Sequence, residues 1–369
     1  MNRLFGWKQT GLFLLALAAG ILPFAVPEVC AAALREGLTL CSGPLLLSLF
    51  PFLVVSRLLI QCPESDLLAL PFRLAAWGIG IRTPCAARVL CIGFLGGFAP
   101  AASAAAQAVR TGQLTAEEAD ALLPACICSG PSFVVLTVGQ SLLGSAELGV
   151  LLFASQITAN YLTAALLNRF AGVRSVKPGS AAPASPAPPR LDEILADAAI
   201  TYCKLCGFIL FFRMLAAGAG ALLPAGAGTL CSVLLEVCSG CDLASRTGRW
   251  GSLLCCAALS VQGLSVLLQV RTICPPEMTL RPLYRSRLLH LPLSLALFYL
   301  LLPGGEADVF STLPARVLLM RRVPPDCALL VFAVCCMAAC TLRSGIRQVE
   351  QKQMARNAGG CCINSKTLL

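Results

Sequence analysis

Long apolar runs separated by short polar connections dominate this chain. A helix needs about 20 predominantly apolar residues to cross the hydrocarbon core of a bilayer. Runs of roughly that length, several of them interrupted by Pro or Gly, cover residues 11–26, 38–56, 121–144, 148–167, 200–223, 250–270, 288–302 and 327–342. The pattern predicts an all-α polytopic membrane protein with about eight to ten spans.

Composition supports this class. Of the 369 residues, 57% are hydrophobic and only 12% are charged, whereas soluble domains carry about 25% charged residues. A soluble globular protein is therefore excluded. The basic excess of 28 over 18 acidic residues indicates cytoplasmic loops under the positive-inside rule, and no nucleic-acid partner is expected. The basic residues expected on the cytoplasmic side are Arg3, Lys8, Arg169, Arg174, Lys177, Arg190, Arg271, Arg281, Arg285, Arg287, Arg343, Arg347, Lys352 and Arg356.

The order of features divides the chain into two related halves. A retained N-terminal transmembrane helix (1–36) precedes the first half (37–170), and a cytoplasmic linker rich in Pro, Ala and Ser (171–190) leads to the second half (191–303). A C-terminal transmembrane segment (304–343) and a cytoplasmic tail (344–369) follow. In each half a small-residue stretch precedes an interrupted span. We therefore expect two pseudo-repeated halves with re-entrant hairpins and broken helices.

The interruptions are the best candidates for a binding site. Irregular backbone at membrane depth is tolerated only where it is buried in protein or lines a watery cavity. The freed helix N-termini carry partial positive charge, which suits an anion. The alternative is a pair of kinks that hold no ligand. The candidate substrate-binding residues are Ser129, Gly130, Ser132, Gln262, Gly263, Ser265 and Gln269.

Several polar residues lie within apolar runs, among them Gln140, Gln156, Asn160 and Glu236. Glu236 is the most prominent of them. An ionisable group in the membrane is costly and is usually functional. We expect Glu236 to bind a coupling proton or cation, or to set charge selectivity. The alternative is that it pairs with a basic side chain for assembly alone.

Other polar features carry less information. Thr115 and Glu118 have capping-box spacing and predict a short solvated connecting helix, in which a catalytic role for Glu117, Glu118 or Asp120 has little support. The Cys203/Cys206 and Cys238/Cys241 pairs lie in apolar surroundings, so packing is favoured over a zinc site. The single histidine, His290, is expected at the interface or packed. Signatures of nucleotide-driven or metal-dependent enzymes are missing, and neither enzyme activity nor a cofactor or metal is expected.

Four stretches resemble a known family: residues 44–59 (PLLLSLFPFLVVSRLL), 93–135, 234–240 (LLEVCSG) and 261–270 (VQGLSVLLQV). They are similar to the YlbJ-type sporulation integral membrane proteins of the nucleoside-recognition, or Gate, group, which resembles concentrative nucleoside transporters in architecture. The resemblance covers roughly residues 10–345. It places the family's hairpin motif on Gly96, Gly97 and Pro100. This chain has Gly97 where the family carries a serine, and Gln262 where it carries a glycine.

The resemblance implies a transporter of dipicolinic acid, a small anionic metabolite, acting in the outer forespore membrane made by the mother cell. The expected partners are this substrate, the lipid bilayer, a coupling proton or cation, and a second copy of the chain. Two alternatives stay open, which are transport of nucleosides and a non-transporting membrane scaffold for spore assembly.

Overall fold

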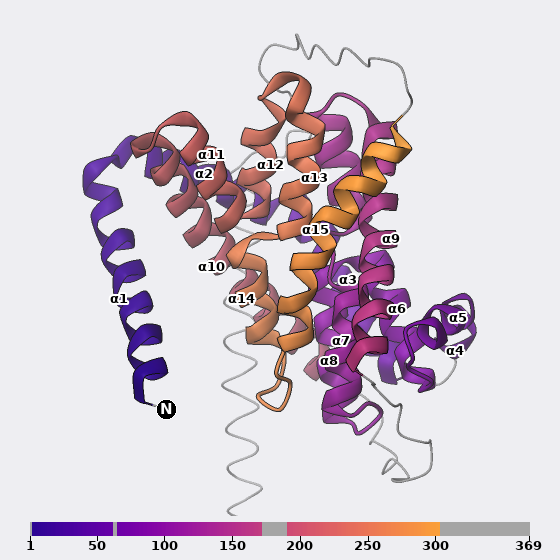
Figure 1. Ribbon diagram of the computed structural model, residues 1–369. Helices are drawn as coiled ribbons and strands as arrows, with labels where there is room; N and C mark the ends of the chain where they lie inside the picture. The colour runs from indigo at the N-terminus through magenta and orange to yellow at the C-terminus, as the bar shows by residue number, and fades with distance from the viewer. Residues whose placement is uncertain (1, 62–64, 172–189, 303–369) are drawn as a thin grey trace, which may run out of the picture.

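The computed structural model describes residues 2–61, 65–171 and 190–302, and the regular structure in these ranges is entirely helical (Figure 1). The predicted all-α class is confirmed. The predictions for the linker, the C-terminal segment at 304–343 and the tail at 344–369 lie almost wholly outside the described residues.

The helices follow one another with few long connections. In chain order they are α1 (Asn2–Ala25), α2 (Pro27–Ser42), α3 (Pro44–Gln61), α4 (Ser65–Leu68), α5 (Leu70–Gly78), α6 (Pro84–Gly96), α7 (Phe98–Arg110), α8 (Ala116–Cys126), the π-helix η1 (Ser132–Leu142), α9 (Ala146–Ala171), α10 (Leu191–Leu222), α11 (Ala225–Leu235), α12 (Val237–Ser245), the short η2 (Gly248–Trp250), α13 (Gly251–Val261), α14 (Gly263–Ile273) and α15 (Arg281–Leu301).

Among the described residues, four helical stretches are long and apolar enough to cross a membrane. They are Pro27–Leu47, Ala146–Ala171, Leu191–Leu222 and Gly248–Ile273. Large apolar side chains stay exposed on the outside of the helices, among them Leu47, Phe170, Leu230 and Leu300. Lipid, rather than water, is the solvent that such a surface suits. The described chain is therefore a polytopic membrane protein.

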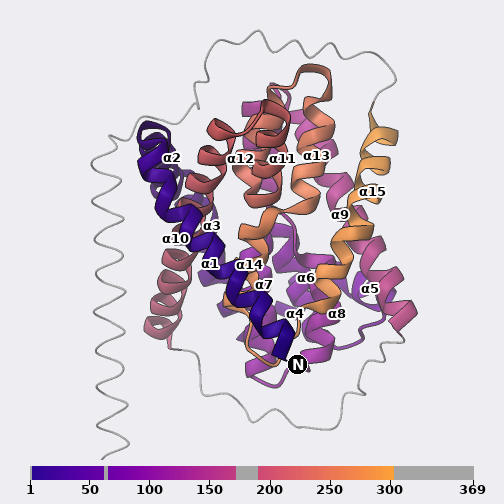
Figure 2. The same ribbon diagram turned by 60° about the vertical axis from the view of Figure 1, so that its left-hand side comes forward.

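The same order of elements occurs twice. Helices α6 and α7 pack against each other as a hairpin, and the interrupted pair α8 and η1 follows. In the second half α11 and α12 form the hairpin, followed by α13 and α14. The first hairpin lies in the lower half of the molecule and the second in the upper half (Figures 1 and 2). Superposition of the halves as a repeat, and re-entry of each hairpin into one face of a bilayer, stay predictions.

Small residues let the two halves share one core. Helix α7 is rich in alanine, and most of its side chains are buried. Small side chains allow helix backbones to approach closely in lipid, where van der Waals packing drives association. A single apolar cluster joins Ala101 and Ala105 of α7 to Val233 of α11 and Val266 of α14.

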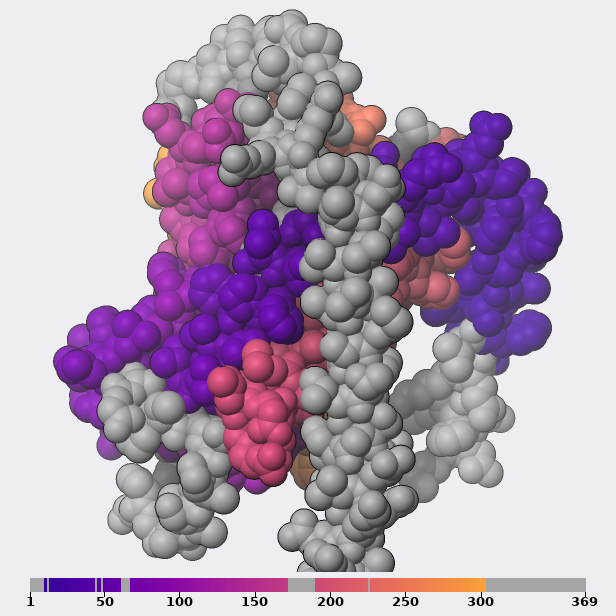
Figure 3. All heavy atoms as spheres, turned by 180° about the vertical axis from the view of Figure 1, so that it is seen from behind, coloured from indigo at the N-terminus to yellow at the C-terminus, as the bar shows by residue number. Residues whose placement is uncertain are grey.

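The N-terminal helices cover the outside of this core. Helix α10 packs against α2 and α3, and violet atoms of the first half border the rose-coloured start of α10 in Figure 3. A buried guanidinium strengthens this contact. Arg57 on α3 forms a 2.7 Å ion pair with Asp197 on α10 and also donates to Thr201 at 3.3 Å.

Four arginines lie at helix ends on one side of the molecule. Helices α7 and α9 end, and α10 and α15 begin, at the lower end in Figures 1 and 2. Arg110, Arg169, Arg190 and Arg281 lie at these helix ends. The positive-inside rule predicts that this end faces the cytoplasm.

The connecting helix α8 differs from the prediction. The capping box is confirmed, because the Thr115 side chain accepts from the Glu118 backbone and Glu118 reaches back to the Thr115 backbone. The predicted solvation was wrong, since Glu118 and Asp120 are both buried. Helix α8 packs against α6, α9 and α15, and these neighbours supply partners. Thr83 donates to Glu118 at 2.6 Å, and Thr279 donates to Asp120 through its hydroxyl at 2.6 Å.

Candidate functional site

Within the described residues, helices are interrupted at four places that the sequence predicts as sites. Gly97 separates α6 from α7, and residues 127–131 separate α8 from η1. Glu236 separates α11 from α12, and Gln262 separates α13 from α14, which begins at Gly263. Each hairpin tip and each interrupted helix therefore supplies one interruption, to which we refer as the four breaks.

In the first half, the hairpin tip touches the interrupted helix through backbone atoms. Gly97 has a φ of +80°, a conformation that favours glycine. A Cβ atom at Gly97 would lie 2.6 Å from the backbone nitrogen of Gly130. No side chain fits between two backbones at this distance. Glycine at position 97 is thus required both by conformation and by space.

The second half repeats this arrangement. Gly263 has a φ of +68°, and a Cβ atom there would lie 2.9 Å from both the Glu236 nitrogen and the Leu235 carbonyl oxygen. Gln262, directly before it, also has a positive φ, of 62°. Such a conformation is uncommon for a residue other than glycine and often marks a functional position.

A side-chain bond connects the two pairs of breaks. Gln262 donates from Nε2 to the Ile127 carbonyl oxygen at 3.2 Å, and Asn160 of α9 donates to the same oxygen at 3.3 Å. The freed carbonyl of the first interrupted helix is therefore satisfied by an amide of the second. The four breaks meet in the middle of the described structure.

The polar side chains among the predicted substrate-binding residues divide into a buried group and one exposed residue. Ser129, Gln262, Ser265 and Gln269 are buried, and Gln269 donates to the Ser265 hydroxyl at 2.8 Å. The Oε1 atoms of Gln262 and Gln269 are buried without a hydrogen-bond partner among the described residues. Ser132, by contrast, is exposed at the start of η1.

The glycines and proline of the predicted motifs lie at the breaks. Gly96 and Pro100 are buried on either side of the hairpin tip, and a Cβ atom at Gly96 would lie 2.9 Å from the Pro100 ring. Gly130 is half-buried beside Gly97, and Gly263 is buried against Glu236. These residues shape the contact between breaks through their small size.

Glu236 caps helix α12. Its carboxylate accepts hydrogen bonds from the backbone nitrogens of Cys238 at 2.8 Å and Ser239 at 2.6 Å, and the residue is only 2% exposed. The carboxylate thus satisfies two backbone donors and complements the positive end of the helix. The N-terminus of α12 is occupied by the protein's own anion, so it does not offer an open anion site.

The prediction that Arg287 faces the cytoplasm was wrong. Arg287 is 8% exposed, donates from Nη2 to Asn160 Oδ1 at 3.2 Å, and contacts Ser286. Its Nη1 atom is buried and has no hydrogen-bond partner in the described part of the chain. No carboxylate of the described residues forms an ion pair with it.

The helical spacing of residues on α15 is a sequence signal for the burial of Arg287. Arg287, His290, Ser294 and Phe298 are buried and recur at intervals of three and four residues on α15, which places them on one face. Arg281 and Arg285 are four residues apart and exposed on another face. Grouping all the arginines of this segment as one cytoplasmic cluster overlooked this difference.

Polar side chains also join α9 to α13 and α15. Gln156 of α9 donates to the Cys256 carbonyl at 3.2 Å and to the Ser260 hydroxyl at 2.9 Å. The backbone oxygen of Gln156 lies 3.2 Å from Nε2 of His290. His290 is fully buried, so its predicted packed position is confirmed. This network fixes the helices that carry Asn160, Gln262 and Arg287.

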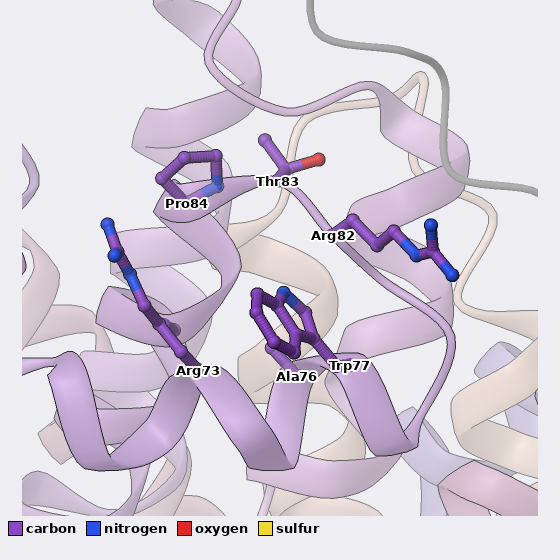
Figure 4. A pocket seen from close by; sticks show the side chains of 7 residues that line it. Arg73, Ala76, Trp77, Arg82, Thr83 and Pro84 are labelled. Carbon is purple, nitrogen blue, oxygen red and sulfur yellow. The ribbon is translucent and has the colours of Figure 1, made fainter.

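A separate pocket lies between α5 and the start of α6 (Figure 4). Its volume is about 190 Å³, and its lining contains none of the predicted site residues. The side chains of Arg73 and Arg82 point away from each other on either side of Trp77 (Figure 4). Because the two guanidinium groups diverge, this pocket lacks a converged charge. The lining residues are Arg73, Ala76, Trp77, Arg82, Thr83, Pro84 and Ala87.

The described residues bring no group of three or more His, Cys, Asp or Glu side chains into a position to hold a metal ion. Their cysteines are free thiols, and both CxxC pairs consist of one buried and one half-buried residue. A scan against models of protein families, and searches of curated proteins and of solved structures, gave no match to this chain.

Proposed function

We propose that this protein carries a small anionic metabolite across a membrane through a site at the four breaks. The observation that carries the proposal is the meeting of these breaks. Interrupted helices concentrate unpaired backbone groups and buried amides in the middle of a lipid-facing bundle, where they are tolerated only in a packed or ligand-binding interior. The two hairpins lie toward opposite ends of the molecule (Figures 1 and 2), an arrangement that suits alternating access to a site between them.

For the substrate we propose dipicolinic acid, moved from the mother cell across the outer forespore membrane. This identification rests on the resemblance of residues 44–59, 93–135, 234–240 and 261–270 to YlbJ-type proteins. It also rests on charge, because a planar dicarboxylate is attracted by the helix N-termini that open at the breaks, those of η1 and α14.

Uptake by the purified protein in liposomes tests this proposal. We expect labelled dipicolinic acid to accumulate in proteoliposomes and labelled nucleoside to stay outside. Nucleoside uptake without dipicolinate uptake would show that the site binds a neutral substrate instead. If neither compound enters while the reconstituted protein keeps its helical fold, transport of these substrates is refuted and a scaffolding role gains support.

Glu236 is proposed to couple transport to an ion or to set charge selectivity, in addition to capping α12. Glu236→Gln retains one acceptor oxygen and loses the charge, so we expect a loss of about 1–2 kcal/mol in the free energy of unfolding. We also expect the dependence of uptake on pH to become flat. Uptake measured across a pH series, with unfolding followed in detergent, gives both quantities.

Glu147→Gln is the matched control, because Glu147 is an exposed carboxylate in the first turn of α9. It should leave both measurements near the wild-type values. If Glu236→Gln is less stable yet keeps the wild-type pH dependence, Glu236 is a cap alone and the coupling role is eliminated.

A further inference from the structure

Arg287 is a buried cation without an anionic partner among the described residues. It is 8% exposed, and its Nη1 atom makes no hydrogen bond. Removing a charge from solvent without pairing it is costly. Ionisable side chains that persist within membrane segments commonly mark the path or binding site of a substrate.

The guanidinium of Arg287 lies beside the four breaks. Its Nη2 atom donates to Asn160 Oδ1 at 3.2 Å, and Asn160 Nδ2 donates to the Ile127 carbonyl at 3.3 Å. That carbonyl also accepts the bond from Gln262 at 3.2 Å. One amide side chain thus separates the cation from the first interrupted helix.

Asn160 orients the guanidinium without neutralising it. A neutral amide oxygen holds Nη2 in place, whereas an aspartate at the same position would form an ion pair. Nε donates to the Ser286 hydroxyl at 3.3 Å, and Nη1 is the guanidinium nitrogen left without a partner among the described residues. A planar guanidinium is well suited to two parallel hydrogen bonds with a carboxylate.

We propose that Arg287 binds a carboxylate group of the substrate and thereby selects carboxylate anions over neutral molecules. The inference rests on the proposed function, since it assigns the charge recognition of that same site. The neutral side chain of Asn160 is a necessary part of it, because it leaves the positive charge to be paired by the substrate.

Asn160→Asp tests the inference with little change in side-chain size. The new carboxylate is expected to pair with Arg287 and to lower dicarboxylate uptake about tenfold or more, because a charge-assisted bond to substrate is lost. Asn160→Ala is the matched control. It loses the bonds to Ile127 and to Arg287 but adds no charge, so we expect a smaller loss of uptake than for Asn160→Asp.

A second variant tests charge selectivity directly. We expect Arg287→Gln to lose the preference for dipicolinate over the neutral pyridine-2,6-dicarboxamide. The dicarboxamide should then bind as well as dipicolinate or better. Arg285→Gln removes an exposed charge from the same helix and should retain the preference of wild type. Size-exclusion profiles and thermal unfolding show which variants are folded.

The outcomes separate this inference from the proposed function. If wild type takes up dipicolinate and folded Asn160→Asp and Arg287→Gln do so equally well, the role of Arg287 is overturned while transport stands. If wild type takes up no dipicolinate, the proposed substrate fails. Thermal stabilisation by aromatic mono- and dicarboxylates then decides on Arg287: stabilisation of wild type but not of Asn160→Asp supports it, and equal or absent stabilisation refutes it.

Discussion

Replacing Gly97 by alanine is expected to lower the free energy of unfolding by about 3–5 kcal/mol. Two costs add. The backbone at Gly97, with φ +80° and ψ −162°, lies in a region that is essentially restricted to glycine. The added Cβ atom would also lie 2.6 Å from the nitrogen and 2.9 Å from the Cα atom of Gly130. Backbone atoms cannot rotate away as a side chain can, so the breaks must separate.

Gly112→Ala is the control for backbone strain alone. Gly112 also has a positive φ, of +69°, but a Cβ atom there meets nothing within 4 Å. We expect this variant to lose only about 1–2 kcal/mol. Unfolding in detergent, followed by helical signal, measures both. Equal losses for the two variants would show that the first hairpin does not touch the interrupted helix.

Replacing Asp120 by alanine is the second change with a large expected effect, a loss of about 3–5 kcal/mol. The buried carboxylate accepts from the Thr279 nitrogen at 2.8 Å, the Thr279 hydroxyl at 2.6 Å and the Leu280 nitrogen at 3.1 Å. It thereby holds Leu280, which has a φ of +57° at the start of α15. The variant would leave two backbone donors without this partner and release a strained turn.

Asp192→Ala provides the comparison, because Asp192 forms an exposed ion pair with Arg190. Such pairs contribute less than about 1 kcal/mol. The same unfolding measurement applies to both variants. We also expect Asp120→Ala to reduce dipicolinate uptake, since α15 begins at this turn and carries Arg287. A folded Asp120→Ala protein of wild-type stability would show that the turn is held by other contacts.

Local sequence pattern was sufficient for the breaks and for the helical class. Gly and Pro punctuation at 128–132 and at 261–265 marks the ends of helices that the structure also interrupts. The Thr115 and Glu118 spacing identified a capping box because both partners lie within one turn. These features depend on residues close in the chain, where propensity and capping rules apply.

Long-range partners could not be predicted in this way. Asp120 bonds to residues 159 and 160 positions away, and Arg287 bonds to Asn160 across 127 positions. Helix packing determines these contacts. Which helix faces meet cannot be read from a single sequence. The predicted exposure of Asp120 and Arg287 therefore followed the usual behaviour of charged residues and was wrong for both.

The short hairpins have a consequence for biogenesis. Helices α6 and α7 have 13 residues each, or about 20 Å of rise, and α11 and α12 have 11 and 9. None of them reaches across a hydrocarbon layer of about 30 Å. Lipid cannot satisfy the polar backbone of a hairpin tip. We therefore expect stable insertion of each hairpin to require the interrupted helix that covers its tip, so that the two assemble jointly rather than inserting as independent spans.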